Sequence, residues 1–277
     1  LREENVLSIF RHKQGLQLGT GILVGSFAFI LGMLVLFGET FLPYSDMTAF
    51  IYLAIGYAIV DIGVPSKIML SKGMLREPTG KYAIKSSVIN VTLGLLAVTG
   101  LVILNSTPET ILLKIGGIFG FAAGFYILHE FIHRLDDYIL MFEEAEAQFA
   151  ITFSLLLGLS YATEIIGLST VLGAFFAGIL VSRSDFSDSR AFQEKIKAIG
   201  LGLFIPIFFA WFGLGLQLDS IIANLGAATF LFGLSTVSKI MIGYTMSKIH
   251  GIDKPMTVAA SLLSLDIETL VVLLIGI

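Results

Sequence analysis

The sequence of 277 residues contains no cysteine, a single tryptophan and few charged residues, which make up only 14% of the chain. Without cysteine, the protein has neither disulfide bonds nor thiolate metal ligands. Soluble domains carry about 25% charged residues, so a chain this poor in charge cannot cover a water-exposed surface with polar groups. A net charge of −4 and a pI near 5.6 also exclude a nucleic-acid binder.

Apolar residues take the place of the missing charge. They make up 56% of the chain, the mean hydropathy is +0.90, and 29 glycines are spread through apolar segments. Such composition is typical of helices that pack closely in lipid, and it predicts an all-α polytopic membrane protein. About nine segments are long enough to serve as spans or half-spans: residues 16–38, 48–70, 84–104, 110–131, 147–166, 168–182, 200–218, 223–247 and 255–277.

The basic residues support this number of spans. If residue 1 is cytoplasmic, 14 of the 17 Lys and Arg residues fall in loops on the cytoplasmic side, as the positive-inside rule requires. Of the others, Lys67 and Lys114 lie near span ends and can reach the interface, whereas Lys239 lies mid-span. We expect a multi-pass protein of the cell membrane, with residues 71–83 and 183–199 on one side.

Ionisable residues inside spans are the strongest indication of function, because a charge at the bilayer centre costs several kcal/mol. Lys239 needs a carboxylate partner if it is to stay charged there. Asp266 and Glu268 are two residues apart, so only one of them is expected to face a central cavity. A fixed salt bridge that only ties helices together is the alternative role for Asp61 and Lys239, and an acid at the interface is the alternative for Glu164. The acidic candidates are Asp61, Glu164, Asp266 and Glu268.

Asp61 stands just before Gly63 and Pro65, which disfavour a continuous helix. The segments Ala58–Pro65 and Leu263–Thr269 each place Asp-Ile mid-membrane, and the two segments cross in opposite directions if there are nine spans. Inverted repeats that carry broken helices are typical of secondary transporters. The sequence therefore predicts two interrupted helices, one in the second span and one near Asp266.

Three stretches resemble the cation/proton antiporter superfamily, the Kef-type and sodium/proton exchanger group. Leu168–Leu180 looks like its GLSxxLGAFxAGxL stretch, Phe204–Phe209 with Gly213–Asp219 resembles its "PIFF…GL" helix, and Ser238-Lys239 resembles its mid-membrane lysine. The resemblance implies inverted repeats whose interrupted helices cross at the midplane. It also implies a homodimer that needs no cofactor and exchanges Na⁺ or K⁺ for protons by alternating access.

The same resemblance implies that residues 1–277 form one transmembrane transporter domain, cut from a longer polypeptide with further N-terminal helices and a closing C-terminal helix. It also exposes departures. Asn90-Val91 stand where the family carries Asp-Asp or Asn-Asp, and Asp266-Ile267-Glu268 replace Arg-Gly-Glu. We therefore expect Asp61 to carry the ion, Lys239 to be its electrostatic partner, Asn90 to be a neutral ligand, and Asp266 or Glu268 to be a second carboxylate.

A competing motif is His129-Glu130-Phe131-Ile132-His133, which matches H-E-x-x-H. On a helix this spacing puts both imidazoles on one face for zinc, with Glu130 as general base. The third ligand would come from Asp136, Asp137 or Glu143. A zinc-dependent intramembrane hydrolase is thus one alternative to transport. A membrane scaffold or sensor that has lost transport is another.

Overall fold

The computed structural model of the chain describes residues 13–42, 46–60, 69, 73–74, 77–140, 145–182, 184–215 and 218–263. Every regular element in these ranges is a helix, which confirms the all-α prediction. The described residues fall into two compact units. Unit 1 comprises residues 99–214, and unit 2 comprises residues 13–98 together with 215–263. The helix α5 (Pro78–Leu104) lies mostly in unit 2.

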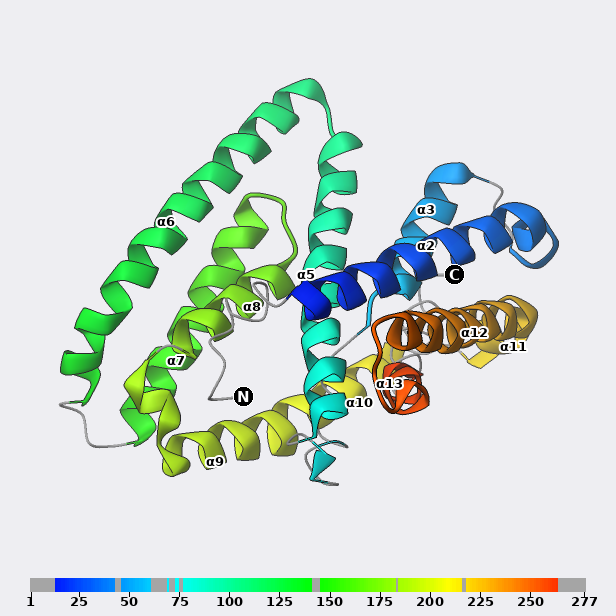
Figure 1. The fold of residues 1–277 in the computed structure, drawn as a ribbon. Helices are drawn as coiled ribbons and strands as arrows, with labels where there is room; N and C mark the ends of the chain where they lie inside the picture. Colours follow the sequence, from blue (N-terminus) through cyan, green and yellow to red (C-terminus); the bar gives the residue numbers. More distant parts are fainter. Residues whose placement is uncertain are drawn as a thin grey trace. The chain divides into compact units, whose positions relative to one another are not determined.

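Unit 2 contains, besides α5, the helices α2 (Lys13–Phe41), α3 (Met47–Ala58), α11 (Leu218–Ala223), α12 (Leu225–Ile249) and α13 (Pro255–Leu262). Helix α2 packs against both α3 and α12, and α12 packs against α13 (Figure 1). Their shared core is apolar and includes Leu23, Ile30, Tyr57, Ala58 and Leu231. Segments far apart in the sequence are thus joined around the end of α3.

Unit 1 contains α6 (Pro108–Leu140), α7 (Ala145–Ile165), α8 (Thr170–Val181), the 3-10 turn η2 (Asp185–Asp188), α9 (Arg190–Ile199), the π-helical turn η3 (Gly200–Phe204) and α10 (Ile205–Gly215). Helices α7 and α8 lie side by side. Their apolar contact centres on Leu159, Ala177 and Leu180, with Phe121 and Phe125 of α6 packed against it.

The sequence places a turn at Gly167, between the fifth and sixth apolar segments, and the structure confirms it. The Gly167 N–H donates to the Glu164 carbonyl at 2.8 Å, and the Leu168 N–H donates to the Thr163 carbonyl at 2.9 Å. This pair of bonds is the Schellman arrangement, which needs a left-handed residue after the helix. Gly167 supplies it, with φ of +78°. Glycine adopts this backbone conformation without a steric penalty.

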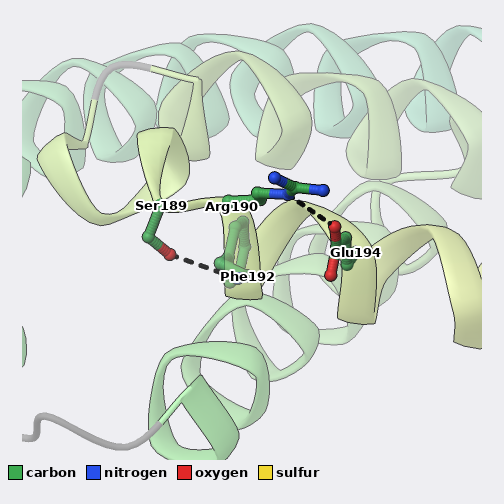
Figure 2. Close-up of polar contacts among 4 residues, drawn as sticks. All are labelled: Ser189, Arg190, Phe192 and Glu194. Carbon is green, nitrogen blue, oxygen red and sulfur yellow. Dashed lines mark hydrogen bonds and ion pairs between the residues drawn. The ribbon is translucent and has the colours of Figure 1, made fainter.

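The connection between α8 and α10 is more structured than a loop. Figure 2 shows how α9 begins: the Ser189 hydroxyl oxygen accepts from the Phe192 N–H at 3.1 Å, and the Arg190 Nε donates to Glu194 at 2.8 Å. The first contact is an N-cap, and the second is an i, i+4 pair on the helix surface. Phe192 is buried against Phe186 and Val181. Part of the segment 183–199 is therefore a short amphipathic helix.

Among the described residues, six helical stretches are long and apolar enough to cross a membrane: Lys13–Phe41, Pro78–Leu104, Thr110–Glu130, Glu146–Ile165, Arg190–Gly215 and Leu225–Ile249. Helices α3 and α8 are apolar but have only 12 residues each. The chain is thus a multi-pass membrane protein. The number of nine spans stays a prediction, because the ninth segment is described only as far as Leu263.

Two ion pairs bear on the predicted sidedness. Within unit 2, the Lys254 ammonium lies 2.9 Å from the Glu77 carboxylate. Within unit 1, Lys195 of α9 pairs with Glu146 at the start of α7. Each pair joins two loop regions that the distribution of basic residues assigns to the same side. Both contacts therefore agree with the predicted pairing of these loops on one side, and the orientation itself stays a prediction.

Candidate ion-binding site at the end of α3

Helix α3 is short because the chain changes from helical to extended backbone within the second apolar segment. The helix begins at the N-cap Asp46, whose carboxylate accepts from the Ala49 N–H at 3.3 Å, and it ends at Ala58. Ile59 is extended, with φ of −69° and ψ of 137°. The end of α3 within the second apolar segment agrees with the predicted interruption of the second span, whereas Gly63-Val64-Pro65, where the sequence places the break, lie outside the described residues. Residues 61–68, including Asp61, lie outside the described residues.

The side chain of Asn90, on α5, hydrogen-bonds to the backbone at this interruption. Its Oδ1 accepts from the Val60 N–H at 2.7 Å, and its Nδ2 donates to the Ala58 carbonyl at 3.3 Å. Asn90 is 1% exposed. One side-chain amide thereby serves a donor and an acceptor on the backbone at the helix end, where groups would otherwise be left unpaired in an apolar interior. Because an amide oxygen has two lone pairs, Oδ1 keeps acceptor capacity for a further group.

Gly94 lies one turn after Asn90 on α5 and allows the extended segment to come close. A Cβ atom at Gly94 would lie 2.3 Å from Cγ1 of Ile59. No side chain fits at that distance, so glycine is required here. Asn90 and Gly94 thus form the part of α5 that contacts Ile59 and Val60.

Helix α12 reaches the same place from the other half of the sequence. The Ser235 hydroxyl donates to the Tyr57 carbonyl at 3.5 Å, and the Ser238 hydroxyl donates to the Ser235 carbonyl at 2.8 Å. Lys239 follows four residues after Ser235, on the same face of the helix. It is wholly buried, at 0% exposure. Lys239 is thus on the face of α12 that contacts the end of α3.

The structure brings two of the predicted site residues, Asn90 and Lys239, to helices that hold the same interruption. Glu164 lies in the last turn of α7 in unit 1, with its side chain exposed. Asp266 and Glu268, and with them the second predicted break, lie outside the described residues.

The zinc motif begins on α6, where the His129 ring lies 6.4 Å from the Phe125 ring and Glu130 is exposed. The side chain of His133 lies outside the described residues, as do those of Asp136, Asp137 and Glu143. Among the side chains that are described, no three His, Asp or Glu residues come close enough to hold a metal ion.

Comparison with known proteins identifies the family. A family model described as "Sodium/hydrogen exchanger, transmembrane" matches residues 7–276. The chain belongs to this sodium/hydrogen exchanger family. Its membership agrees with the resemblance that the sequence motifs carry.

Three relatives of this exchanger-family chain illustrate the similarity. A Na⁺/H⁺ antiporter of Enterococcus hirae is 32% identical over 122 residues, which are 43% of this chain and 31% of the relative. K⁺/H⁺ antiporter 1 of Saccharomyces cerevisiae is 26% identical over 251 residues, 86% of this chain and 28% of the relative. The high-affinity Na⁺/H⁺ antiporter NhaS3 of Synechocystis is 23% identical over 228 residues, with 78% and 48% covered. The chain therefore spans less than half the length of these relatives.

The exchanger-family stretch Leu168–Leu180 has a clear structural role. Ser169 caps α8 by accepting from the Val171 N–H at 3.2 Å. Gly173 lies so close to α7 that a Cβ atom there would be 2.3 Å from the Leu159 carbonyl oxygen. In this chain the motif is therefore a packing surface between α7 and α8.

Sequence reasoning missed three residues at the interruption: Gly94, Ser235 and Ser238. A signal for them was available. Gly94 follows Asn90 by one turn, and Ser235, Ser238 and Lys239 share one face of an otherwise apolar span. Polar groups that share one stripe of a membrane helix face protein or a cavity rather than lipid.

Proposed function

We propose that the chain is the transport core of a secondary active transporter that exchanges a monovalent cation, Na⁺ or K⁺, for protons across the cell membrane. The observation that carries the proposal is the interrupted α3, held by Asn90 on one side and by the helix of the buried Lys239 on the other. The names of the Na⁺/H⁺ and K⁺/H⁺ antiporters among the relatives support the same substrates.

An interruption of this kind suits ion transport for a physical reason. Within a membrane, the free backbone groups of a broken helix are tolerated where protein or a water-filled cavity satisfies them. In secondary transporters, unwound carbonyls and half-helix ends coordinate the coupling ions near the midplane. Ile59 provides such extended backbone, Val60 bonds to the buried amide of Asn90, and the helix that carries the buried Lys239 contacts the end of α3 at Tyr57.

Asp61, the residue that follows Val60 in the sequence, is proposed as the carrier. Its carboxylate holds either a proton or a cation, and alternating access exposes it to the two sides in turn. Lys239 is the electrostatic partner of this group. Asn90 hydrogen-bonds to the broken segment and contributes the remaining lone pair of its Oδ1 as a neutral ligand. Asp266 or Glu268 supplies a second carboxylate.

Further features of the proposal come from the exchanger family and from the span count. Glu164 lies along the ion pathway, and the protein works as a homodimer in the lipid bilayer without a cofactor. Residue 1 lies on the cytoplasmic side. Because a single carboxylate exchanges one proton for one cation, each cycle moves no net charge.

Asp61→Asn tests the carrier. In proteoliposomes that contain the full-length protein, this substitution abolishes cation-driven proton movement because an amide cannot exchange a proton for a cation. Asp253→Asn is the matched control, since Asp253 is an exposed acid between α12 and α13, and it leaves exchange unchanged. Full activity in Asp61→Asn would refute the assignment of the carrier.

A further inference from the structure

A buried hydroxyl on α2 takes no part in any contact described so far. Ser26 is 0% exposed, and its Oγ has no hydrogen-bond partner among the residues that the structure describes. Burial of a hydroxyl in an apolar interior without a hydrogen-bond partner destabilises the fold. Such a group in a native protein calls for an explanation, one of which is a missing ion or water.

Several other hydroxyl side chains of unit 2 bond to carbonyls of their own helices. Ser86 donates to the Ala83 carbonyl at 2.9 Å, and Thr92 donates to the Val88 carbonyl at 2.7 Å. This back-bonding is available to any serine within a helix. Ser26 does not use it, so its oxygen remains available to another group.

The position of Ser26 is fixed by its neighbours on α2. Gly19 and Ile30 lie on the same buried face, one at each side of Ser26 along the helix. A Cβ atom at Gly19 would lie 2.6 Å from the Ser86 carbonyl oxygen, one turn before Asn90 on α5. Ile30 belongs to the apolar core that includes Tyr57 and Ala58 at the end of α3. Ser26 therefore lies on α2 between the part of the helix that approaches α5 and the part that packs against the end of α3.

Helix α12 also approaches α2 next to Ser26. A Cβ atom at Gly25, the residue before Ser26, would lie 2.7 Å from Cγ2 of Ile242. Ile242 is three residues from Lys239, less than one helical turn. The three helices around Ser26 are thus the same three that meet at the interruption, namely α3, α5 and α12.

We propose that the Ser26 hydroxyl oxygen is a direct ligand of the transported monovalent cation. The inference deepens the proposed function and rests on it. Alkali cations prefer hard oxygen ligands, and a serine hydroxyl offers two lone pairs without adding charge. Ser26 would supply this oxygen from α2, which packs against α3 and α12 and approaches α5 at Gly19.

The test compares Ser26→Ala with Ser247→Ala in the full-length protein. Ser247 is also 0% exposed with an unpaired Oγ, but it lies eight residues after Lys239 at the end of α12. In proteoliposomes, the half-saturating concentrations of Na⁺ and K⁺ are measured for both variants and the parent. Loss of one oxygen bound to a charged group raises that concentration about tenfold or more in Ser26→Ala, and Ser247→Ala leaves it unchanged.

The possible outcomes separate the two proposals. If the parent exchanges cations and Ser26→Ala behaves like Ser247→Ala, the ligand assignment is overturned and the proposed function stands. If the parent exchanges no cation, the proposed function fails and the ligand assignment fails with it. If Ser26→Ala does not fold, Ser26→Cys replaces it: the variant is nearly isosteric, and its soft sulfur is a poor ligand for an alkali cation, so the same tenfold rise is expected.

Discussion

At the scale of the residue, the site depends on polar side chains that serve the backbone of another helix. Asn90 bonds to both Ala58 and Val60 at the end of α3. An acid at the same position would keep the bond from the Val60 N–H but lose the donor to the Ala58 carbonyl. The amide is therefore suited to hold a broken helix, whereas a carboxylate is suited to hold an ion. This difference explains why the proposed carrier is a different residue.

The role of Asn90 predicts a loss of stability in Asn90→Ala. The substitution leaves the Val60 N–H and the Ala58 carbonyl without their partner in a buried place, which costs about 2–4 kcal/mol in free energy of unfolding. Thermal unfolding of the purified protein in detergent measures the loss. Asn105→Ala is the control, because the Asn105 amide bonds to the Leu101 carbonyl on an exposed surface where water replaces it. Equal stability of the two variants would contradict this role.

At the scale of the element, residues of α5 determine the position at which α3 ends. The apolar pattern and the Gly63-Val64-Pro65 cluster are local signals that predict an interrupted second span, and the end of α3 within that segment agrees with the prediction. They do not predict that the helix stops at Ala58, since the bonds and the close approach that stop it come from Asn90 and Gly94, about 30 residues later in the chain. The turn at Gly167 is predictable for the opposite reason: its two hydrogen bonds lie within six consecutive residues.

The close approach at Gly94 gives a prediction about this element. Gly94→Ala forces its new methyl group against Ile59 and lowers the free energy of unfolding by about 1–3 kcal/mol, the usual cost of overpacking. The double variant Gly94→Ala/Ile59→Ala relieves the clash and recovers part of the loss. A double-mutant cycle on thermal unfolding measures this coupling. Gly100→Ala is the control, since no atom of the described residues lies within 4 Å of its added Cβ, and it leaves stability unchanged or improves it.

At the scale of the whole molecule, composition predicts the class and the membrane location, because the shortage of charge excludes a soluble surface of any fold. The distribution of Lys and Arg predicts orientation, and the pairs Glu77–Lys254 and Glu146–Lys195 each join loops that this distribution places on the same side. The amphipathic helix α9 was not expected within the segment 183–199. Its signal is an N-cap serine followed by a short polar repeat, which resembles an ordinary loop between two apolar segments.

The predicted orientation can be measured directly because residues 1–277 contain no cysteine. Ser45→Cys and Ser71→Cys, each introduced alone with any cysteines elsewhere in the full-length protein replaced, react with a membrane-impermeant thiol reagent from opposite sides of the membrane. The expectation follows from the positive-inside rule, which puts residues 71–83 on the cytoplasmic side and residues 39–47 on the other. Labelling of both variants from the same side would show that the number of spans is wrong.

The most direct test of the transport proposal is proton flux driven by a cation gradient in proteoliposomes, measured at several clamped membrane potentials. A gradient of Na⁺ or K⁺ is expected to drive protons in the opposite direction. The rate is expected to be independent of potential, since one cation replaces one proton and moving a net charge would couple the cycle by about 2.3 kcal/mol per 100 mV. Absence of any cation-dependent proton movement would contradict the exchange itself, and a rate that changes steeply with potential would contradict the one-for-one mechanism.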